Sequence, residues 1–206
     1  MRAKPLLRVY GVFLRRIYSL DSRLAVQLPT RPGEAEMCEP VHRDAVVFLP
    51  IRLQHLWGEF CRELVVRSAL GNCSTRSGQL VPPASGSVRV RDLPNMSSLP
   101  FWGRGTYWED PRFALRQARR LNVVNYNSIA LGLTSASSVL DELKTVRNFI
   151  THPNRSTAAE YIQLTRTKGL RGLSPEQFLP QRTPGGATIF ETWTRQLVTA
   201  AWNAVT

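Results

Sequence analysis

Apolar residues recur at spacings of three and four along most of the chain, which is the pattern of amphipathic helices. The signals that start and stop helices agree with these stripes. Asp110 precedes Pro111 as a side-chain cap before a proline, and Gly71 follows the second stripe, in which Pro50 falls near the expected first turn. Six helices are therefore expected, at about residues 5–20, 49–70, 110–122, 138–152, 157–167 and 189–202.

Segments rich in Gly, Ser and Pro separate these stripes at 28–40, 71–100 and 169–187. The middle one buries too few apolar side chains to offset its ordering entropy, so we expect a long loop or flexible insertion, with a short strand at 87–90. Residues 169–187 should form an irregular connection to the last helix. The strand signal is otherwise almost absent, and the chain is expected to be one all-α domain over 1–206, a bundle of five or six helices.

Positive charge is the unusual feature of the composition. The chain has 27 Lys plus Arg against 15 Asp plus Glu, a formal charge of +12, and only three of the cations are lysines. Arginine binds phosphate bidentately and stacks on bases, so this bias favours a nucleic-acid partner, although a GC-rich genome also replaces lysine by arginine. The aromatic segment 101–110 is either a turn docked on the core or a base-stacking platform.

The helix expected at 110–122 has a basic face. This face either follows the phosphates of RNA or is a solvated surface. The candidate RNA-binding residues on it are Arg112, Arg116, Arg119 and Arg120.

The remaining chemistry-bearing side chains suggest neither a metal nor a cofactor. Cys38, Cys61 and Cys73 form no CxxC pair and have no histidine at metal-ligand spacing, so we expect no metal site, no cofactor and a reducing, cytoplasmic location. Arginines interrupt the apolar residues of the opening segment, which is expected to be an amphipathic helix in preference to a signal or transit peptide. No stretch has the ~18 unbroken apolar residues of a membrane span.

The stretch VRNFITHPN, residues 146–154, contains the most specific motif. In this motif asparagine follows arginine directly, and histidine comes five positions after the arginine. A chain of this composition is expected to contain such a match by chance about 0.014 times. On a straight helix Arg147 and His152 would lie roughly 140° apart. Pro153 disfavours the helical conformation of the residue before it, so the helix should stop at His152 and free its side chain from that geometry.

This motif, at the end of an amphipathic helix in a basic helical protein, resembles the HEPN superfamily, of the RiboL-PSP-like or MAE type. Members are small helical bundles with an Arg-x4-6-His motif in which the residue after arginine is frequently Asn, Asp or His. Arg147, Asn148 and His152 match that pattern. The resemblance covers about 20 residues, from Val139 to Tyr161, together with the helical layout around them. It implies a metal-independent endoribonuclease that works as a homodimer with a composite active site.

The residue types suit RNA cleavage by attack of the 2′-hydroxyl. Imidazole transfers protons near neutral pH, so His152 is the candidate acid or base. Arg147 keeps its charge and offers a planar fork to phosphate oxygens, and Asn148 could orient either group. His42, expected in a loop, and His55, in another helix, have no catalytic pattern around them, so a second copy of His152 across a two-fold axis would supply the missing proton-transfer group.

We therefore expect a toxin or anti-phage defence effector that cuts RNA and is inhibited by an antitoxin or another regulatory protein. Three alternatives stay open. In the first, Arg147 simply pairs with Asp141 or Glu142 while His152 ends the helix. In the second, the domain is an inactive dimerisation or RNA-binding module of a larger complex. A helical DNA-binding regulator is the third alternative, without a clear helix-turn-helix to support it.

Overall fold

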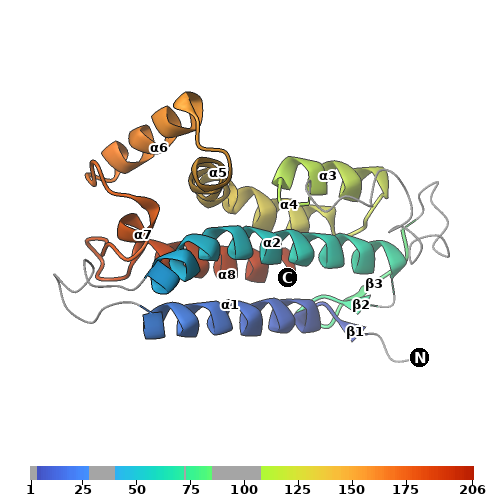
Figure 1. Ribbon diagram of the computed structural model, residues 1–206. Coiled ribbons are helices and arrows are strands. Elements are labelled where there is room, and N and C mark those ends of the chain that lie inside the picture. Colours follow the sequence, from blue (N-terminus) through green and yellow to red (C-terminus); the bar gives the residue numbers. More distant parts are fainter. Residues whose placement is uncertain (1–3, 28–39, 72, 85–107) are drawn as a thin grey trace. The chain divides into compact units, whose positions relative to one another are not determined.

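The computed structural model describes residues 4–27, 40–71, 73–84 and 108–206, and it is predominantly helical (Figure 1). The predicted all-α class is confirmed. The described part of the chain forms these helices: α1 (Leu7–Gln27), α2 (Pro40–Leu70), α3 (Pro111–Arg120), α4 (Tyr126–Ser135), α5 (Ser137–Thr151), α6 (Arg155–Thr167), α7 (Pro175–Phe178) and α8 (Ile189–Ala204).

A small three-stranded sheet, which the sequence did not predict, accompanies the helices. Strand β1 (Lys4–Pro5) pairs in parallel with β2 (Cys73–Ser74), and β2 pairs antiparallel with β3 (Leu80–Val81), with Cys73 opposite Val81. Both of these residues are buried. Strands of two residues are too short to show an alternating pattern. The first part of the predicted 71–100 loop is thus a β-hairpin, and the strand expected at 87–90 lies outside the described residues.

The backbone contacts divide the chain, which we expected to be one domain, into two compact units. Unit 1 comprises Met1–Arg15, His55–Ser137 and Leu197–Thr206. Unit 2 comprises Arg16–Gln54 and Ser138–Gln196. The sheet, α3 and α4 therefore belong to unit 1, whereas α5, α6 and α7 belong to unit 2 apart from the first residue of α5.

The core of unit 1 is aromatic and tightly packed. Phe13 contacts both Trp57 and Phe60 of α2, with ring centroids 5.9 and 4.9 Å away, and these two rings lie 5.5 Å from each other. Elsewhere in this unit α4 approaches the C-terminal part of α8 so closely that a β-carbon on Gly132 would lie 2.5 Å from that of Ala204. Glycine at this position allows the two helix backbones to come together.

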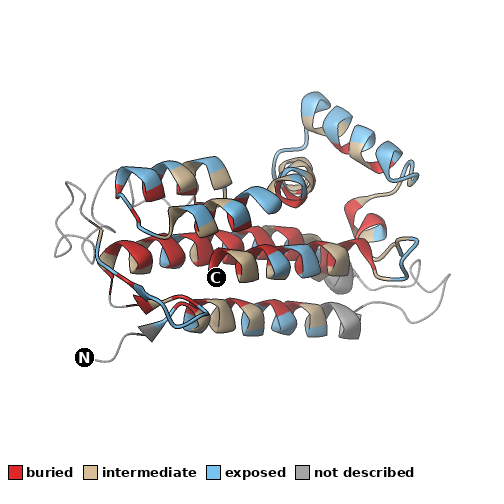
Figure 2. Ribbon diagram, turned by 180° about the vertical axis from the view of Figure 1, so that it is seen from behind, coloured by how far each residue is buried: buried red, intermediate tan, exposed pale blue. Residues whose placement is uncertain are grey.

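Unit 2 has a chain of aromatic rings through its interior. Phe149 of α5 stacks on Tyr161 of α6 at 4.5 Å with parallel planes, and Tyr161 meets the edge of Phe178 in α7 at 5.9 Å. Phe178 in turn contacts Trp193 of α8 at 6.2 Å. Most of α6 is otherwise exposed, as Figure 2 shows, so these ring contacts, together with the Tyr161 hydroxyl that donates to the Leu173 carbonyl at 3.1 Å, help to hold α6 to the rest of its unit.

Several helix boundaries differ from those expected. The α2 helix begins at Pro40 and runs through Pro50, so our placement of Pro50 in a first turn and of His42 in a loop is wrong. Buried Val46 and Leu49 extend the apolar stripe of α2 to the N-terminal side of Pro50, and this packing offsets the backbone hydrogen bond that proline cannot make. The α5 helix begins at Ser137, one residue before the predicted start at residue 138.

A half-buried carboxyl group in unit 2 is poorly solvated. The Asp21 Oδ2 atom accepts a hydrogen bond from the Thr194 hydroxyl at 3.3 Å, while Oδ1 is buried and has no hydrogen-bond partner among the described residues. Burial, and secondarily the Glu191 carboxylate, raise the pKa of Asp21 from 3.8 to about 6, although the Thr194 hydrogen bond and Arg195 oppose this shift. The folded state therefore holds this proton more tightly than the unfolded chain does.

This pKa makes the stability of the protein depend on pH. Between pH 4 and 6 the folded state binds more protons than the unfolded state, so the free energy of unfolding falls as pH rises, by up to roughly 3 kcal/mol. Asp21→Asn keeps an acceptor for Thr194 and removes the charge. We expect urea melts to show roughly 1–2 kcal/mol more stability at pH 8 and a flatter profile between pH 4 and 6. An unchanged profile, or an equal effect of exposed Asp44→Asn, would contradict this prediction.

Candidate functional site

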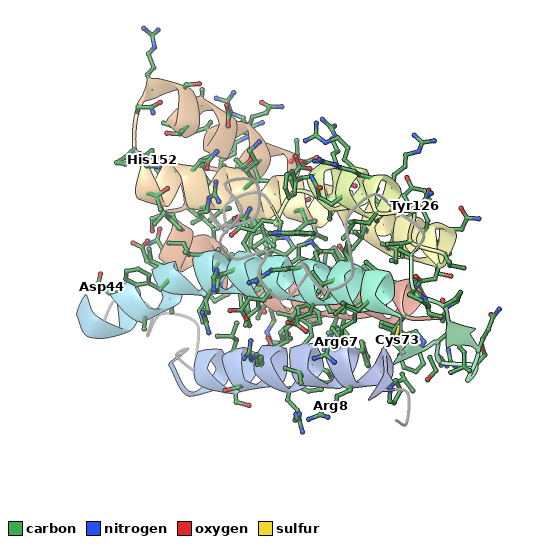
Figure 3. The ribbon with its side chains drawn as sticks, turned by 90° about the vertical axis from the view of Figure 1, so that its right-hand side faces the viewer. Arg8, Asp44, Arg67, Cys73, Tyr126 and His152 are labelled. Carbon is green, nitrogen blue, oxygen red and sulfur yellow. The ribbon has the colours of Figure 1, made fainter. Side chains whose placement is uncertain are left out.

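The end of α5 carries the motif residues. The last helical residue is Thr151, and the His152 N–H still donates to the Asn148 carbonyl at 2.9 Å before the chain turns at Pro153. The predicted stop of the helix at His152 is thereby confirmed. Figure 3 shows the His152 side chain at this end of α5, where it points outward.

Hydrogen bonds fix the corner between α5 and α6. The His152 carbonyl accepts from the Thr157 hydroxyl at 2.9 Å and from the Asn154 side-chain amide at 3.1 Å. Asn154 also caps α6, because its Oδ1 atom accepts from the backbone N–H groups of Ser156 and Thr157. The backbone of His152 is therefore held on both sides, while its imidazole is exposed and has no hydrogen bond or ion pair within the described ranges.

The other two motif residues contact each other. The Arg147 Nη2 and Nε atoms lie 3.0 and 3.4 Å from Asn148 Oδ1, and both side chains are half-buried. This contact orients the guanidinium group, which has further interactions besides. The structure thus joins Arg147 to Asn148 and places His152 at the same end of the helix without a hydrogen bond to either side chain.

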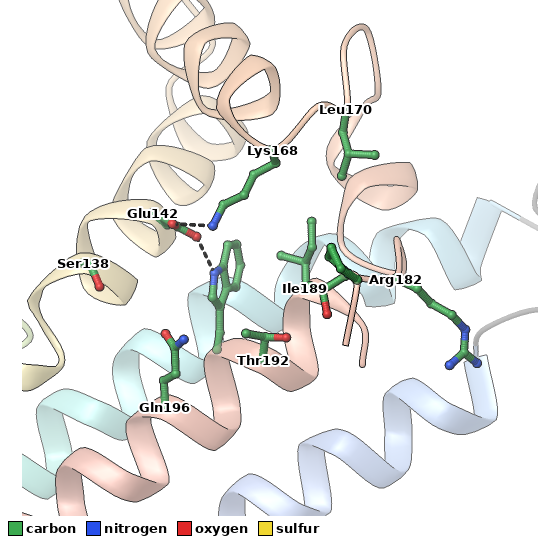
Figure 4. A pocket seen from close by; sticks show the side chains of 11 residues that line it. Ser138, Glu142, Lys168, Leu170, Arg182, Ile189, Thr192 and Gln196 are labelled. Carbon is green, nitrogen blue, oxygen red and sulfur yellow. Dashed lines mark hydrogen bonds and ion pairs between the residues drawn. The ribbon is translucent and has the colours of Figure 1, made fainter. Parts of the chain in front are cut away.

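The Glu142 carboxylate, one of the two alternative partners of Arg147, is occupied by other groups. Glu142 Oε2 accepts from the indole N–H of Trp193 at 2.8 Å, and Oε1 lies 2.7 Å from Lys168 Nζ. Figure 4 shows both donors meeting this carboxylate at one wall of a cavity of about 330 Å³, to which α8 contributes Ile189 and Thr192. The alternative Arg147–Glu142 pair is therefore not formed. Sequence reasoning missed this cluster because its members lie far apart along the chain.

Of the two donors to Glu142, we expect Trp193 to matter more. Lys168 is more than a third exposed, so solvent screens its ion pair, whereas Trp193 is only 2% exposed. Trp193→Phe should lower the free energy of unfolding by roughly 1–2 kcal/mol beyond its cavity cost, because it removes the buried donor. Trp57→Phe is the matched control, since the buried Trp57 N–H has no hydrogen-bond partner in the described part of the chain. Equal losses of stability in urea melts would refute this role for Trp193.

The candidate RNA-binding arginines lie on α3, in unit 1, and all four are exposed. Asp110 caps this helix as predicted, with Oδ1 accepting from the Arg112 N–H at 2.8 Å. Trp108 is buried and meets the edge of Phe113 at 5.4 Å, so this end of the aromatic segment packs inward. The rest of that segment, 101–107, lies outside the described residues.

Among the described residues, no group of three or more His, Cys, Asp or Glu side chains is arranged to hold a metal ion. No described helix is both long enough and apolar enough to cross a membrane. Outside the motif, His55 lies on α2 and pairs with Glu59 at 3.0 Å.

Comparison with known proteins gives no match: no family model fits the sequence, and neither the curated proteins nor the solved structures include one that matches it.

Proposed function

We propose that this protein is a metal-independent endoribonuclease of the HEPN type. The observation that carries the proposal is the end of α5, where an exposed histidine on a fixed backbone is at the same helix end as an arginine whose guanidinium is oriented by asparagine. These are the groups that in-line attack of a ribose 2′-hydroxyl requires: a proton-transfer group and a phosphate-binding cation. The product would carry a 2′,3′-cyclic phosphate.

A homodimer completes the proposed chemistry. Cleavage needs one group to take the proton from the 2′-hydroxyl and another to protonate the leaving 5′-oxygen, whereas one copy offers a single histidine at this site. The exposure of His152 leaves its imidazole accessible to RNA and to a second copy. A toxin or defence effector of this kind, in the cytoplasm and under the control of an antitoxin or regulatory protein, is the biological setting we propose.

Total RNA incubated with the purified protein in excess EDTA tests the proposal, with sedimentation velocity run on the same sample. We expect cleavage and a dimeric species. RNA that stays intact but is bound in a salt-sensitive manner would favour the non-catalytic alternative, an RNA-binding or dimerisation module, over the enzyme.

A further inference from the structure

One face of α3 is lined by arginines. Successive residues of a helix are about 100° apart, so Arg112, Arg116 and Arg119 fall within an arc of roughly 60° and span about 10 Å along the axis. All three are exposed, and we call them the arginine stripe. The opposite face of α3 is buried through Ala114 and Ala118. Arg120 lies at the edge of the stripe.

Within the described residues, no acidic side chain pairs with the arginine stripe. The sequence contains no Asp or Glu from Pro111 to Leu140, which covers α3 and the neighbouring α4. None of the three guanidinium groups forms an ion pair within the part of the chain that the structure describes. Like charges three or four residues apart destabilise a helix. Arg116 lies over the Phe113 ring at 6.0 Å, and Arg119 is in the last turn of α3, where the helix dipole favours a cation. Neither interaction offsets the repulsion between neighbouring guanidinium groups, whereas an external anion would.

The shape of the stripe indicates an extended polyanion. A single small anion would need donors that converge on one point, but these guanidinium groups are spread along a line. A membrane surface fits poorly, because the apolar face of α3 packs inside the protein and is not available for insertion. Arginine forks bind phosphate oxygens, and contacts to phosphates carry no information on base sequence.

We propose that the arginine stripe binds the phosphodiester backbone of a nucleic-acid strand, independently of base sequence. That the strand is RNA rests on the proposed function. The stripe contributes affinity and the salt dependence of binding, and it takes no part in bond cleavage. Each arginine that contacts a single-stranded backbone should add about 0.7 to the slope of log affinity against log salt concentration.

Binding should be measured in the His152→Ala background, so that the RNA stays intact and the result does not depend on the proposed catalysis. The probe is a fluorescent single-stranded RNA of about 20 nucleotides, titrated by anisotropy between about 50 and 200 mM salt. The test variant changes Arg112, Arg116 and Arg119 to Gln. The control changes three other exposed arginines to Gln and so removes the same amount of charge. These are Arg8, Arg62 and Arg171.

The test variant should bind the RNA at least about tenfold more weakly, and its slope of log affinity against log salt concentration should be smaller by about 2. The control variant should keep most of the affinity and most of the slope. Changing the same three arginines to Lys should restore most of the slope, and a DNA strand of the same sequence should respond in parallel. Equal losses in the two Gln variants, or no loss in either, would overturn the proposal. Tighter, stripe-dependent binding to anionic vesicles would assign the surface to membranes instead. Circular dichroism confirms that each variant is folded.

Discussion

His152→Ala is expected to lower the rate of RNA cleavage by at least about 100-fold, because it removes the group proposed to transfer protons. The fold should survive this change. The His152 backbone, not its imidazole, makes the hydrogen bonds to Asn154 and Thr157, and these are kept in the variant. Initial rates on a labelled RNA in EDTA, with a urea melt of each protein, measure both effects.

His55→Ala is the matched control for this prediction. His55 is also an exposed histidine on a helix, but its partner is Glu59 and it lies outside the motif. The rate should stay within about twofold of wild type. Arg147→Lys should also lose most of the activity, because lysine keeps the charge but not the planar fork that contacts Asn148. Equal cleavage by the two histidine variants would refute the assignment of His152.

Gly132→Ala is expected to have the largest effect on stability. The added β-carbon would lie 2.6 Å from the Ala200 carbonyl oxygen and 2.6 Å from the Ala204 nitrogen, both of them backbone atoms of α8 that no side-chain rotation can move. The helices α4 and α8 would have to separate within unit 1. We expect the free energy of unfolding to fall by roughly 2–4 kcal/mol.

Gly11→Ala separates this clash from the general effect of replacing glycine in a helix. Gly11 lies within α1, and a β-carbon there would have nothing within 4 Å. Alanine at this position should leave the stability unchanged or raise it by up to about 1 kcal/mol. Urea melts of both variants test the prediction, which fails if Gly132→Ala is as stable as Gly11→Ala.

The helices predicted correctly have strong local signals. The capping aspartate and proline of α3, the proline after α5 and the apolar stripe of α8 each act within a few residues, so the sequence alone reveals them. The α4 helix was missed because its sequence, YNSIALGLTS, is short and rich in weak helix formers. Its position depends instead on the close contact of Gly132 with α8, which only the folded chain creates.

The residues of the candidate site are a prediction from the sequence, whereas their surroundings come from the structure alone. Residue type and spacing singled out Arg147, Asn148 and His152, and Pro153 correctly predicted where the helix ends. The contacts that hold α5 come from distant segments, as when Trp193 donates to Glu142. Such contacts depend on tertiary packing. The spacing of residues along one sequence indicates local structure, but it does not indicate which distant segments come together.

Replacing the 2′-hydroxyl groups of the RNA substrate tests most directly the claim that these hydroxyls attack the phosphate. Two RNA strands of identical sequence, one with ordinary riboses and one with 2′-O-methyl riboses, should be incubated with the protein in EDTA and their new ends identified by mass spectrometry. The account predicts that only the ordinary strand is cut and that its fragments end in 2′,3′-cyclic phosphates, with neither product formed by His152→Ala. Cleavage of the methylated strand at a similar rate, or the same fragments from His152→Ala, would contradict it.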